Sequence, residues 1–287
     1  MSLNHDLIGK PSEPVTKSWT STDTLLYALG IGYGHDDQLH GLEFTTENTD
    51  GIEQVVAPTY GVIMTHGASH GRSLGDFDRA MLVHAEQGLH IHRPIPPAGT
   101  ARIVSTVTDI YDKGSAAIVR SESTASDVQT GAPIVTTTSS VFIRGEGGFG
   151  GDSGPKATWQ APDRDPDWIG SARTWPGQAL LYRLNGDRNP LHADPAFAAR
   201  GGFEKPILHG LCTYGISARL LLGAPFAEDA ASLREFSARF SSPVIPGDEL
   251  TVRAWHTDDG EVLFQTVGAN QKAVIDHGRA RFGPPKA

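Results

Sequence analysis

Two stretches of the chain alternate apolar and polar positions in the manner of strands. The first runs from Met81 to Arg144, is rich in β-branched residues and contains the tight-turn signal D-K-G at 112–114. The second runs from Asp248 to Phe282 around a D-D-G turn at 258–260. Between them, the run L-C-T-Y-G-I-S-A-R-L-L-L after Gly210 is apolar on almost every side, which predicts a helix buried all round. A sheet curled around that helix is the simplest way to bury it.

The remaining segments are shorter and less regular. Ser21, Thr22 or Asp23 could cap a helix over T-L-L-Y-A-L-G, which the following glycines end. Residues 145–168 are dominated by glycine and proline without periodicity, which predicts a linker. The other expectations are a polar surface segment at 1–17, one strand and a loop within 36–56, a short helix at 58–63, and a flexible loop at 65–71.

The second half of the chain repeats the plan of the first. P-G-Q-A-L-L-Y echoes T-D-T-L-L-Y, and S-P-V-I-P-G before a strand echoes R-P-I-P-P-A-G. The D-D-G turn occupies the place of D-K-G, and the matches occur in the same order, which favours duplication over chance similarity of short β patterns. We therefore predict an α+β protein of two repeats, residues 1–150 and 151–287. Aligning the two Leu-Tyr pairs places the acid and imidazole described below in the second repeat alone.

Composition and charge narrow the classes of function. The net charge is −9 and no basic cluster occurs, which argues against nucleic-acid binding. No apolar run is long enough for a membrane span, and the first residues lack the pattern of a secretory signal. The single cysteine, Cys212, excludes an internal disulfide and a cysteine-built zinc site. Together with a C-terminus unlike a peroxisomal address, these features lead us to expect a cytoplasmic protein.

The candidate chemistry is concentrated in Y-R-L-N-G-D-R-N-P-L-H, residues 182–192. Asp187, Asn189 and His192 lie within six positions, and Asn189-Pro190 is a typical helix start that can bring both ionisable groups to one point. At Gly210 a second helix begins, whose first N–H groups have no partner within the helix and could hold a developing oxyanion. Acid, base and oxyanion donor together suit the addition or removal of water beside a thioester carbonyl.

Simpler interpretations exist for each residue alone. Asp187 could be a helix cap and His192 a packed core histidine, and only their combination with Asn189 and Gly210 favours a site. His209 is expected to be structural. A metal site built from Asp187, His192, Asp194 and His209 matches no common ligand spacing.

The segment resembles the signature of the MaoC-like (R)-specific 2-enoyl-CoA hydratases, through Y-R-L-x-G-D-x-N-P-L-H-x-D-P and F-x-x-P-I-L-H-G-L-C-T. The first half is similar to the two-repeat subgroup through L-Y-A-L-G-I-G, P-I-P-P-A-G and G-G-F-G-G, so the resemblance spans most of the chain. It implies a double hot-dog fold, in which each repeat is an antiparallel sheet wrapped around a helix. The implied reaction is reversible hydration of trans-2-enoyl-CoA to (3R)-3-hydroxyacyl-CoA, without a metal or a redox cofactor.

The resemblance also implies residue roles. Asp187 and His192 form the catalytic pair, with His192 favoured as base and Asp187 as proton donor, although one shared water leaves the division open. Asn189 positions the pair, and the Gly210 N–H is the oxyanion donor. The acyl-CoA contacts are His84, Ala85, Lys113 and Phe240. This sequence departs from the pattern at Ala85, where glycine is common, and at Asn185 and Arg188, which puts the shape of the acyl pocket in doubt.

Two alternatives stay open at this level. One is the same fold acting on a carrier-protein thioester, or on a steroid or branched acyl chain. The other is a subunit that binds acyl-CoA without catalysis, against which the intact Asp187/His192 pair argues. The first repeat's helix is expected to be shorter and interrupted by glycines, and the resemblance implies that this opens room for a long or bulky acyl chain. A homodimer of such chains, with no membrane partner, is the expected assembly.

Overall fold

A computed structural model describes residues 3–68, 73–156, 158–227 and 229–283 of the chain. Within them, ten strands form one antiparallel sheet in the spatial order β1-β3-β4-β5-β2-β7-β10-β9-β8-β6. The strands of the first half are β1 Val15–Trp19, β2 Leu82–Ile91, β3 Gly99–Asp112, β4 Ala116–Asp127 and β5 Pro133–Arg144. Those of the second half are β6 Trp168–Arg173, β7 Leu233–Phe240, β8 Glu249–His256, β9 Glu261–Val267 and β10 Ala273–Phe282.

The strand order reads the same from either edge of the sheet to its centre, because β1 to β5 are arranged as β6 to β10 are. The two halves meet at the antiparallel pair β2–β7, where Gly88 lies opposite Ser237. The turns at 112–114 and 258–260 join equivalent strands, β3 to β4 and β8 to β9. The duplication inferred from short sequence echoes is thus visible in the topology.

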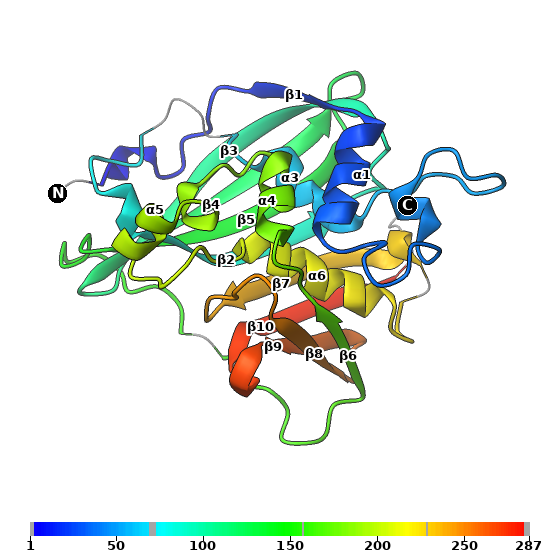
Figure 1. The fold of residues 1–287 in the computed structure, drawn as a ribbon. Helices are drawn as coiled ribbons and strands as arrows, with labels where there is room; N and C mark the ends of the chain where they lie inside the picture. Colours follow the sequence, from blue (N-terminus) through cyan, green and yellow to red (C-terminus); the bar gives the residue numbers. More distant parts are fainter. Residues whose placement is uncertain (1–2, 69–72, 157, 228, 284–287) are drawn as a thin grey trace.

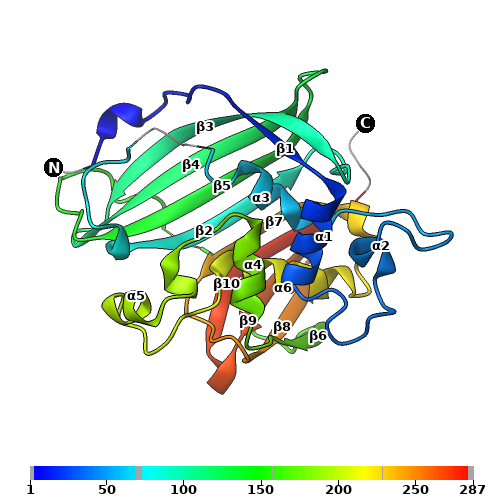
Figure 2. The ribbon, with the colours of Figure 1, turned by 45° about the horizontal axis from the view of Figure 1, so that its top comes forward.

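Helices cover one side of this sheet, which curves around them (Figures 1 and 2). The long central helix of the second half is α6, Gly210–Leu222, and nine of its thirteen residues are buried, as the apolar run predicted. In the first half the equivalent place holds only the 3-10 turn η2, Pro58–Tyr60, and α3, Gly61–Thr65. The sheet therefore wraps a helix in each half, which is the double hot-dog architecture, but the first helix is far shorter.

Two further helices stand at equivalent positions after the edge strands, α1 Ser21–Gly30 and α4 Gln178–Tyr182. The remaining helical elements are α2 Leu42–Thr45, α5 Pro195–Arg200, η1 His5–Leu7, η3 Arg79–Met81, η4 Arg183–Asn185, η5 Pro190–His192, η6 Ala230–Ser232 and η7 Ala269–Gln271. Of the helices described, none combines the length and apolar character needed to cross a membrane. The segment predicted as a linker contains no helix or strand in its described residues until β6 begins at Trp168.

Some local predictions were wrong. The cap of α1 is Thr20, whose extended backbone lets its side chain accept from Asp23 N–H while Asp23 accepts from Thr20 N–H. Residues 36–56 contain the helix α2 in place of a strand, because their apolar residues are too sparse to pair with a sheet edge. The segment 1–17 is not simply polar surface, since Leu3 and Leu7 are buried and β1 pairs with β3. Residues 66–68 form a turn, and 69–72 of the expected loop lie outside the described residues.

The helices α1 and α6 pack so closely that a glycine is required between them. A Cβ at Gly215 would lie 2.5 Å from Ile31 and 2.9 Å from the Tyr27 hydroxyl. We expect Gly215→Ala to lower the free energy of unfolding by about 1–3 kcal/mol, because the helices must move apart. Chemical denaturation of Gly215→Ala measures it. The control Gly223→Ala, where the nearest atom is 3.5 Å away, should change stability little, and an equal loss in both variants would contradict the packing argument.

Candidate active site

A cavity of about 580 Å³ lies between the two halves of the molecule on the helix side of the sheet. The first half contributes residues of β2, β3, β4, β5 and α3, and the second half contributes the segment from Asp187 to Leu211 and the end of β7. Six of the eight residues expected at the site line it: Asp187, Asn189, His192, Gly210, His84 and Phe240. The other two, Ala85 and Lys113, do not.

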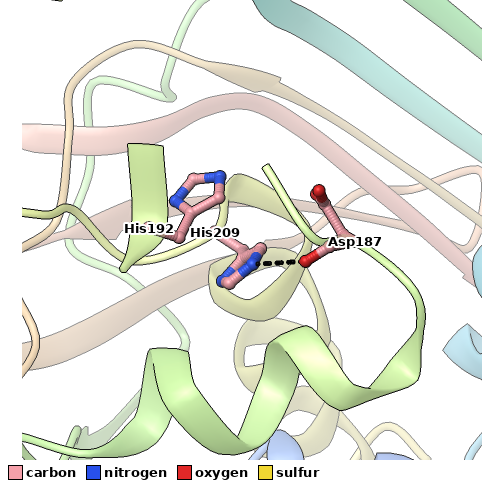
Figure 3. A group of neighbouring side chains, drawn as sticks. All are labelled: Asp187, His192 and His209. Atoms are coloured by element: carbon pink, nitrogen blue, oxygen red, sulfur yellow. Dashed lines mark hydrogen bonds between the residues drawn. The ribbon is translucent and has the colours of Figure 1, made fainter. Parts of the chain in front are cut away.

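A turn at Gly186 and a helical turn capped by Asn189 bring Asp187 and His192 together. Gly186 has a positive φ of 117°, which turns the chain after η4, and Asp187 then accepts a hydrogen bond from Asn189 N–H at 3.2 Å. Asn189 caps the next turn by accepting from Leu191 N–H, as its pairing with Pro190 predicted, although the turn is 3-10 and not α-helical. One donor atom from each of Asp187, His192 and His209 lies within 4.8 Å of the others (Figure 3).

The hydrogen bonds of the two imidazoles settle which nitrogens are free. His192 Nδ1 lies 2.8 Å from the Ile207 carbonyl, which can only accept, so Nδ1 carries the proton and Nε2 has a free lone pair. His209 likewise donates from Nε2 to the backbone carbonyl of Asp187 at 3.2 Å. The two rings stack with their centroids 3.7 Å apart. His209 thereby fixes both members of the pair, consistent with the structural role expected for it.

Burial sets the charge state of these groups. It lowers the pKa of His192 below its ordinary value, and together with the neighbouring His192 it lowers the pKa of His209 to about 3. Burial also acts to raise the pKa of Asp187, but the nearby imidazoles of His209, His66 and His192 and the Asn189 N–H outweigh it and leave the pKa below its ordinary value. At neutral pH the site therefore holds a carboxylate beside the neutral imidazoles of His192 and His209.

These pKa values predict how stability depends on pH. Burial, with a smaller effect of His66, lowers the pKa of His84 to about 4. The unfolded chain, with a histidine pKa near 6.5, then binds protons that the folded chain does not, so stability is full above about pH 6.5 and falls as the pH decreases toward 4. We expect His84 alone to remove about 3 kcal/mol by pH 4. Urea unfolding between pH 7 and 4.5 measures this loss. His84→Gln should make the profile shallower by the share of His84, while the lowered pKa values of His192 and His209 keep the remaining slope. A wild-type profile that is already flat would contradict the burial argument.

Gly210 presents a free amide to the cavity. It is the first residue of α6, its N-cap His209 makes no side-chain capping bond, and among the described residues no acceptor takes the Gly210 N–H. The Phe240 ring lies 3.2 Å from the place where a Cβ of residue 210 would stand, and the His84 ring lies 4.9 Å from the Phe240 ring. The absent side chain therefore keeps the amide accessible beside these rings.

His84 and Ala85 lie at an irregularity of β2. His84 pairs with Val141 and Glu86 pairs with Ser140, so Ala85 is the extra residue of a β-bulge. The bulge aims the His84 ring into the cavity, where its Nε2 lies 3.0 Å from both the Glu86 carbonyl and the Ser139 hydroxyl. Ala85 itself lines neither this cavity nor the second cavity described below.

Lys113 lies on the opposite face of the sheet. Its ammonium donates to the Ser153 carbonyl, within the segment that follows β5. It lines a second cavity of about 760 Å³, together with further basic side chains. These are Arg120, Lys156, Arg239, His277 and Arg279. Arg279 is paired with Glu261, and Glu86 is the only acidic side chain among the described residues of the lining. The other basic side chains therefore leave this cavity positive although the chain as a whole is negative.

The sequence did not single out all the residues that line the first cavity. His66 follows α3 and lines the cavity near Asp187, yet no motif marked it. Several hydroxyl side chains of β3, β4 and β5 also line the cavity, and only the strand register brings them together. A metal ion could use Asp187, His192 and His209, but atoms up to 4.8 Å apart must close before all three reach the roughly 2.1 Å typical of zinc ligands. Asp194, the fourth candidate ligand, caps α5.

Comparison with known proteins agrees with this geometry. Residues 157–277 match the MaoC like domain, and residues 18–145 match the MFE-2 hydratase 2 N-terminal domain. The 3-hydroxyacyl-thioester dehydratase Y of Mycobacterium tuberculosis is 43% identical, over 98% of this chain and 99% of that protein. The chain belongs to the MaoC-like hydratase family.

Two further relatives of this MaoC-like hydratase extend the comparison. Enoyl-CoA hydratase ChsH3 of Mycobacterium tuberculosis is 42% identical over 91% of each chain. The crystal structure of a MaoC-like dehydratase from Phytophthora capsici superposes with a TM-score of 0.87, at 32% identity and 98% coverage of both chains. Both halves of the MaoC-like hydratase thus have counterparts in the family.

Proposed function

We propose that this chain catalyses the reversible syn hydration of trans-2-enoyl-CoA to (3R)-3-hydroxyacyl-CoA. One observation carries the proposal: the cavity brings together a half-buried carboxylate, an imidazole with a free Nε2 and a helix N–H that has no acceptor among the described residues. The family relatives named enoyl-CoA hydratase and 3-hydroxyacyl-thioester dehydratase correspond to the two directions of this reaction.

The proposed chemistry follows from the protonation states. Asp187 and His192 hold one water, and Asn189 fixes the turn between them. As the water oxygen bonds to C3, His192 Nε2 takes its proton, and negative charge on the thioester oxygen is held by the Gly210 N–H. An ionised Asp187 can donate to C2 only after it has received a proton. We therefore propose that the pair shares the proton from the water and returns it to C2, so that OH and H are both added.

We propose that the nucleotide end of coenzyme A binds in the positive second cavity. Phosphate groups are attracted by clustered lysine and arginine, and the cavity holds Lys113, Arg120, Lys156 and Arg239, besides Arg279, which is paired with Glu261. Gln87 of β2 touches both cavities, one on each face of the sheet. In this proposal His84, Ala85, Lys113 and Phe240 contact the acyl-CoA.

The assembly and organisation of the chain extend the proposal. We assign residues 1–150 to a repeat that holds the acyl chain and 151–287 to the catalytic repeat, because Asp187, His192 and Gly210 all belong to the second. We further propose that the protein is a cytoplasmic homodimer and that it uses no metal or cofactor. The free, buried Cys212 is compatible with a reducing compartment. Light scattering after size-exclusion chromatography tests the dimer.

Hydration of a set of trans-2-enoyl thioesters tests the function. Crotonyl-CoA, decenoyl-CoA, a branched enoyl-CoA and a steroid enoyl-CoA are each compared with the same acyl group on a carrier protein. We expect loss of enoyl absorbance with the CoA esters and a (3R) product on chiral chromatography. A (3S) product, or turnover confined to carrier-protein thioesters, would contradict the proposal. Binding of every ester without any turnover would identify an acyl-CoA-binding subunit.

A further inference from the structure

The part of the first cavity that lies in the first half of the molecule is lined by hydroxyl groups. Five side chains form it, and we call them the polar wall: Ser105, Ser121, Ser123, Thr137 and Ser139. They come from three neighbouring strands, β3, β4 and β5, and the register aligns them in two rows across the sheet. Ser123 lies opposite both Ser105 and Thr137, and Ser121 lies opposite Ser139, whose other neighbour is Gln87.

The second half of the same chain shows what this surface is like when a helix covers it. The equivalent strands β9 and β10 turn apolar side chains inward, among them Val262, Phe264, Ile275 and Ala280, and all four are buried. The hydroxyl of Thr266 is an exception, but it is bonded to Ser217 of α6. In the first half, α3 is too short to cover the polar wall, so these hydroxyls face the cavity and whatever fills it.

Not all hydroxyls of the polar wall are satisfied by the protein. Thr137 is bonded to Thr65, and Ser139 to His84. Ser123 donates to Ser105, which leaves the Ser105 proton available. Ser121 is half-buried, and its hydroxyl has no hydrogen-bond partner among the described residues. Ser105 and Ser121, which are diagonal neighbours on β3 and β4, can therefore donate to an acceptor inside the cavity, and a plain alkyl chain offers none.

The polar wall begins at His84 and extends away from it. Ser139 bonds the His84 ring, and Ser121 lies opposite Ser139. Thr137 lies two residues farther along β5, roughly 7 Å from Ser139 at about 3.3 Å per residue, with Ser123 opposite it. An acyl chain that starts at the catalytic pair and enters the first half would thus run along the polar wall.

We propose that the preferred substrates carry an oxygen on the acyl chain, a hydroxyl or a keto group, that accepts hydrogen bonds from Ser121 and Ser105. An unsubstituted chain would displace the water that is hydrogen-bonded to these hydroxyls and offer no acceptor in its place. An oxygenated chain replaces the lost hydrogen bond to water with one to its own oxygen. A site built to bond a substrate oxygen discriminates strongly against an analogue that lacks it. The inference rests on the proposed hydratase function and specifies its substrate class.

Matched substrates and variants test this. We compare kcat/KM for decenoyl-, dodecenoyl- and tetradecenoyl-CoA with their ω-hydroxy and (ω−1)-keto derivatives, on the wild type, Ser121→Ala, Ser105→Ala/Ser121→Ala and Ser121→Thr. We expect about a tenfold preference for an oxygenated chain at one or more lengths, because one buried hydrogen bond is at stake. Ser121→Ala should lose the preference and Ser121→Thr should keep it. Thr124→Val, which removes a hydroxyl of β4 that lines neither cavity, should not change it.

Saturated acyl-CoAs separate this inference from the proposed function, because they cannot be hydrated. Calorimetric titration should give a lower Kd for the oxygenated member of each pair, and Ser105→Ala/Ser121→Ala should remove the difference. The inference is overturned if plain chains bind and react better at every length, or if the preference persists in the double variant. If the inference fails in this way but plain enoyl-CoAs are still hydrated, the proposed hydratase function is unaffected. Selective binding of oxygenated chains without any turnover would support the polar wall and overturn the hydratase.

Discussion

Replacement of Asp187 by asparagine is expected to lower kcat for enoyl-CoA hydration by about 10³-fold, within the range for loss of a positioned acid–base group. The carboxamide keeps the size of the side chain and can still accept from Asn189 N–H, which Asp187 now binds at 3.2 Å. It cannot take or return a proton, and the negative charge that favours protonation of His192 disappears. The rate at which the absorbance of the enoyl thioester falls, followed at saturating substrate, measures kcat directly.

A nearby aspartate provides the matched control. Asp194 caps α5 by accepting from Ala196 N–H at 2.8 Å, and asparagine is an equally good cap. Asp194→Asn should therefore retain wild-type turnover, while both variants bind a saturated acyl-CoA as the wild type does. Activity of Asp187→Asn within tenfold of the wild type would remove the carboxylate from the mechanism. Equal and negligible turnover of wild type and Asp187→Asn, with binding intact, would favour the non-catalytic subunit.

The clustering of Asp187 and His192 could be predicted because it is local in sequence. Asn189 and Pro190 specify a turn by their own chemistry, so the five-position separation of Asp187 and His192 translates directly into proximity. The buried helix after Gly210 followed from an apolar run alone. Likewise, the double hot-dog arrangement followed from the repeated order of helix and strand signals, which reports topology without requiring the register of any strand.

The remainder of the cavity depends on register and on bulges, which single-sequence patterns do not define. One extra residue at Ala85 decides whether His84 faces the cavity or the other side of the sheet. The alignment of Ser121 with Ser139 requires three strands to be paired correctly. Lys113 lies on the opposite face of the sheet from His84, a placement that a turn motif does not reveal.

Replacement of Gly210 by proline should isolate the oxyanion contribution, because it removes one N–H while leaving the helix in place. Proline is favoured at the first position of a helix, and the preceding His209 has φ −58° and ψ 134°, the extended conformation that a residue before proline prefers. Gly210→Ala is the matched variant, since it keeps the N–H and places a Cβ at the same 3.2 Å from the Phe240 ring. Any steric effect on the ring is thus present in both proteins.

We expect kcat of Gly210→Pro to be about 10²-fold below that of Gly210→Ala, the usual loss when an oxyanion donor is removed. The Kd of a saturated acyl-CoA should differ much less between the two variants, because a neutral thioester carbonyl draws less on this hydrogen bond than the charged oxygen of the transition state does. Single-turnover kinetics and calorimetry give the two quantities. If the two variants have equal kcat, the free N–H at the start of α6 does not stabilise the reacting oxygen and another donor must do so. If Gly210→Ala alone already loses most of the activity, the absence of a side chain beside Phe240, and not the amide, is what the site requires of residue 210.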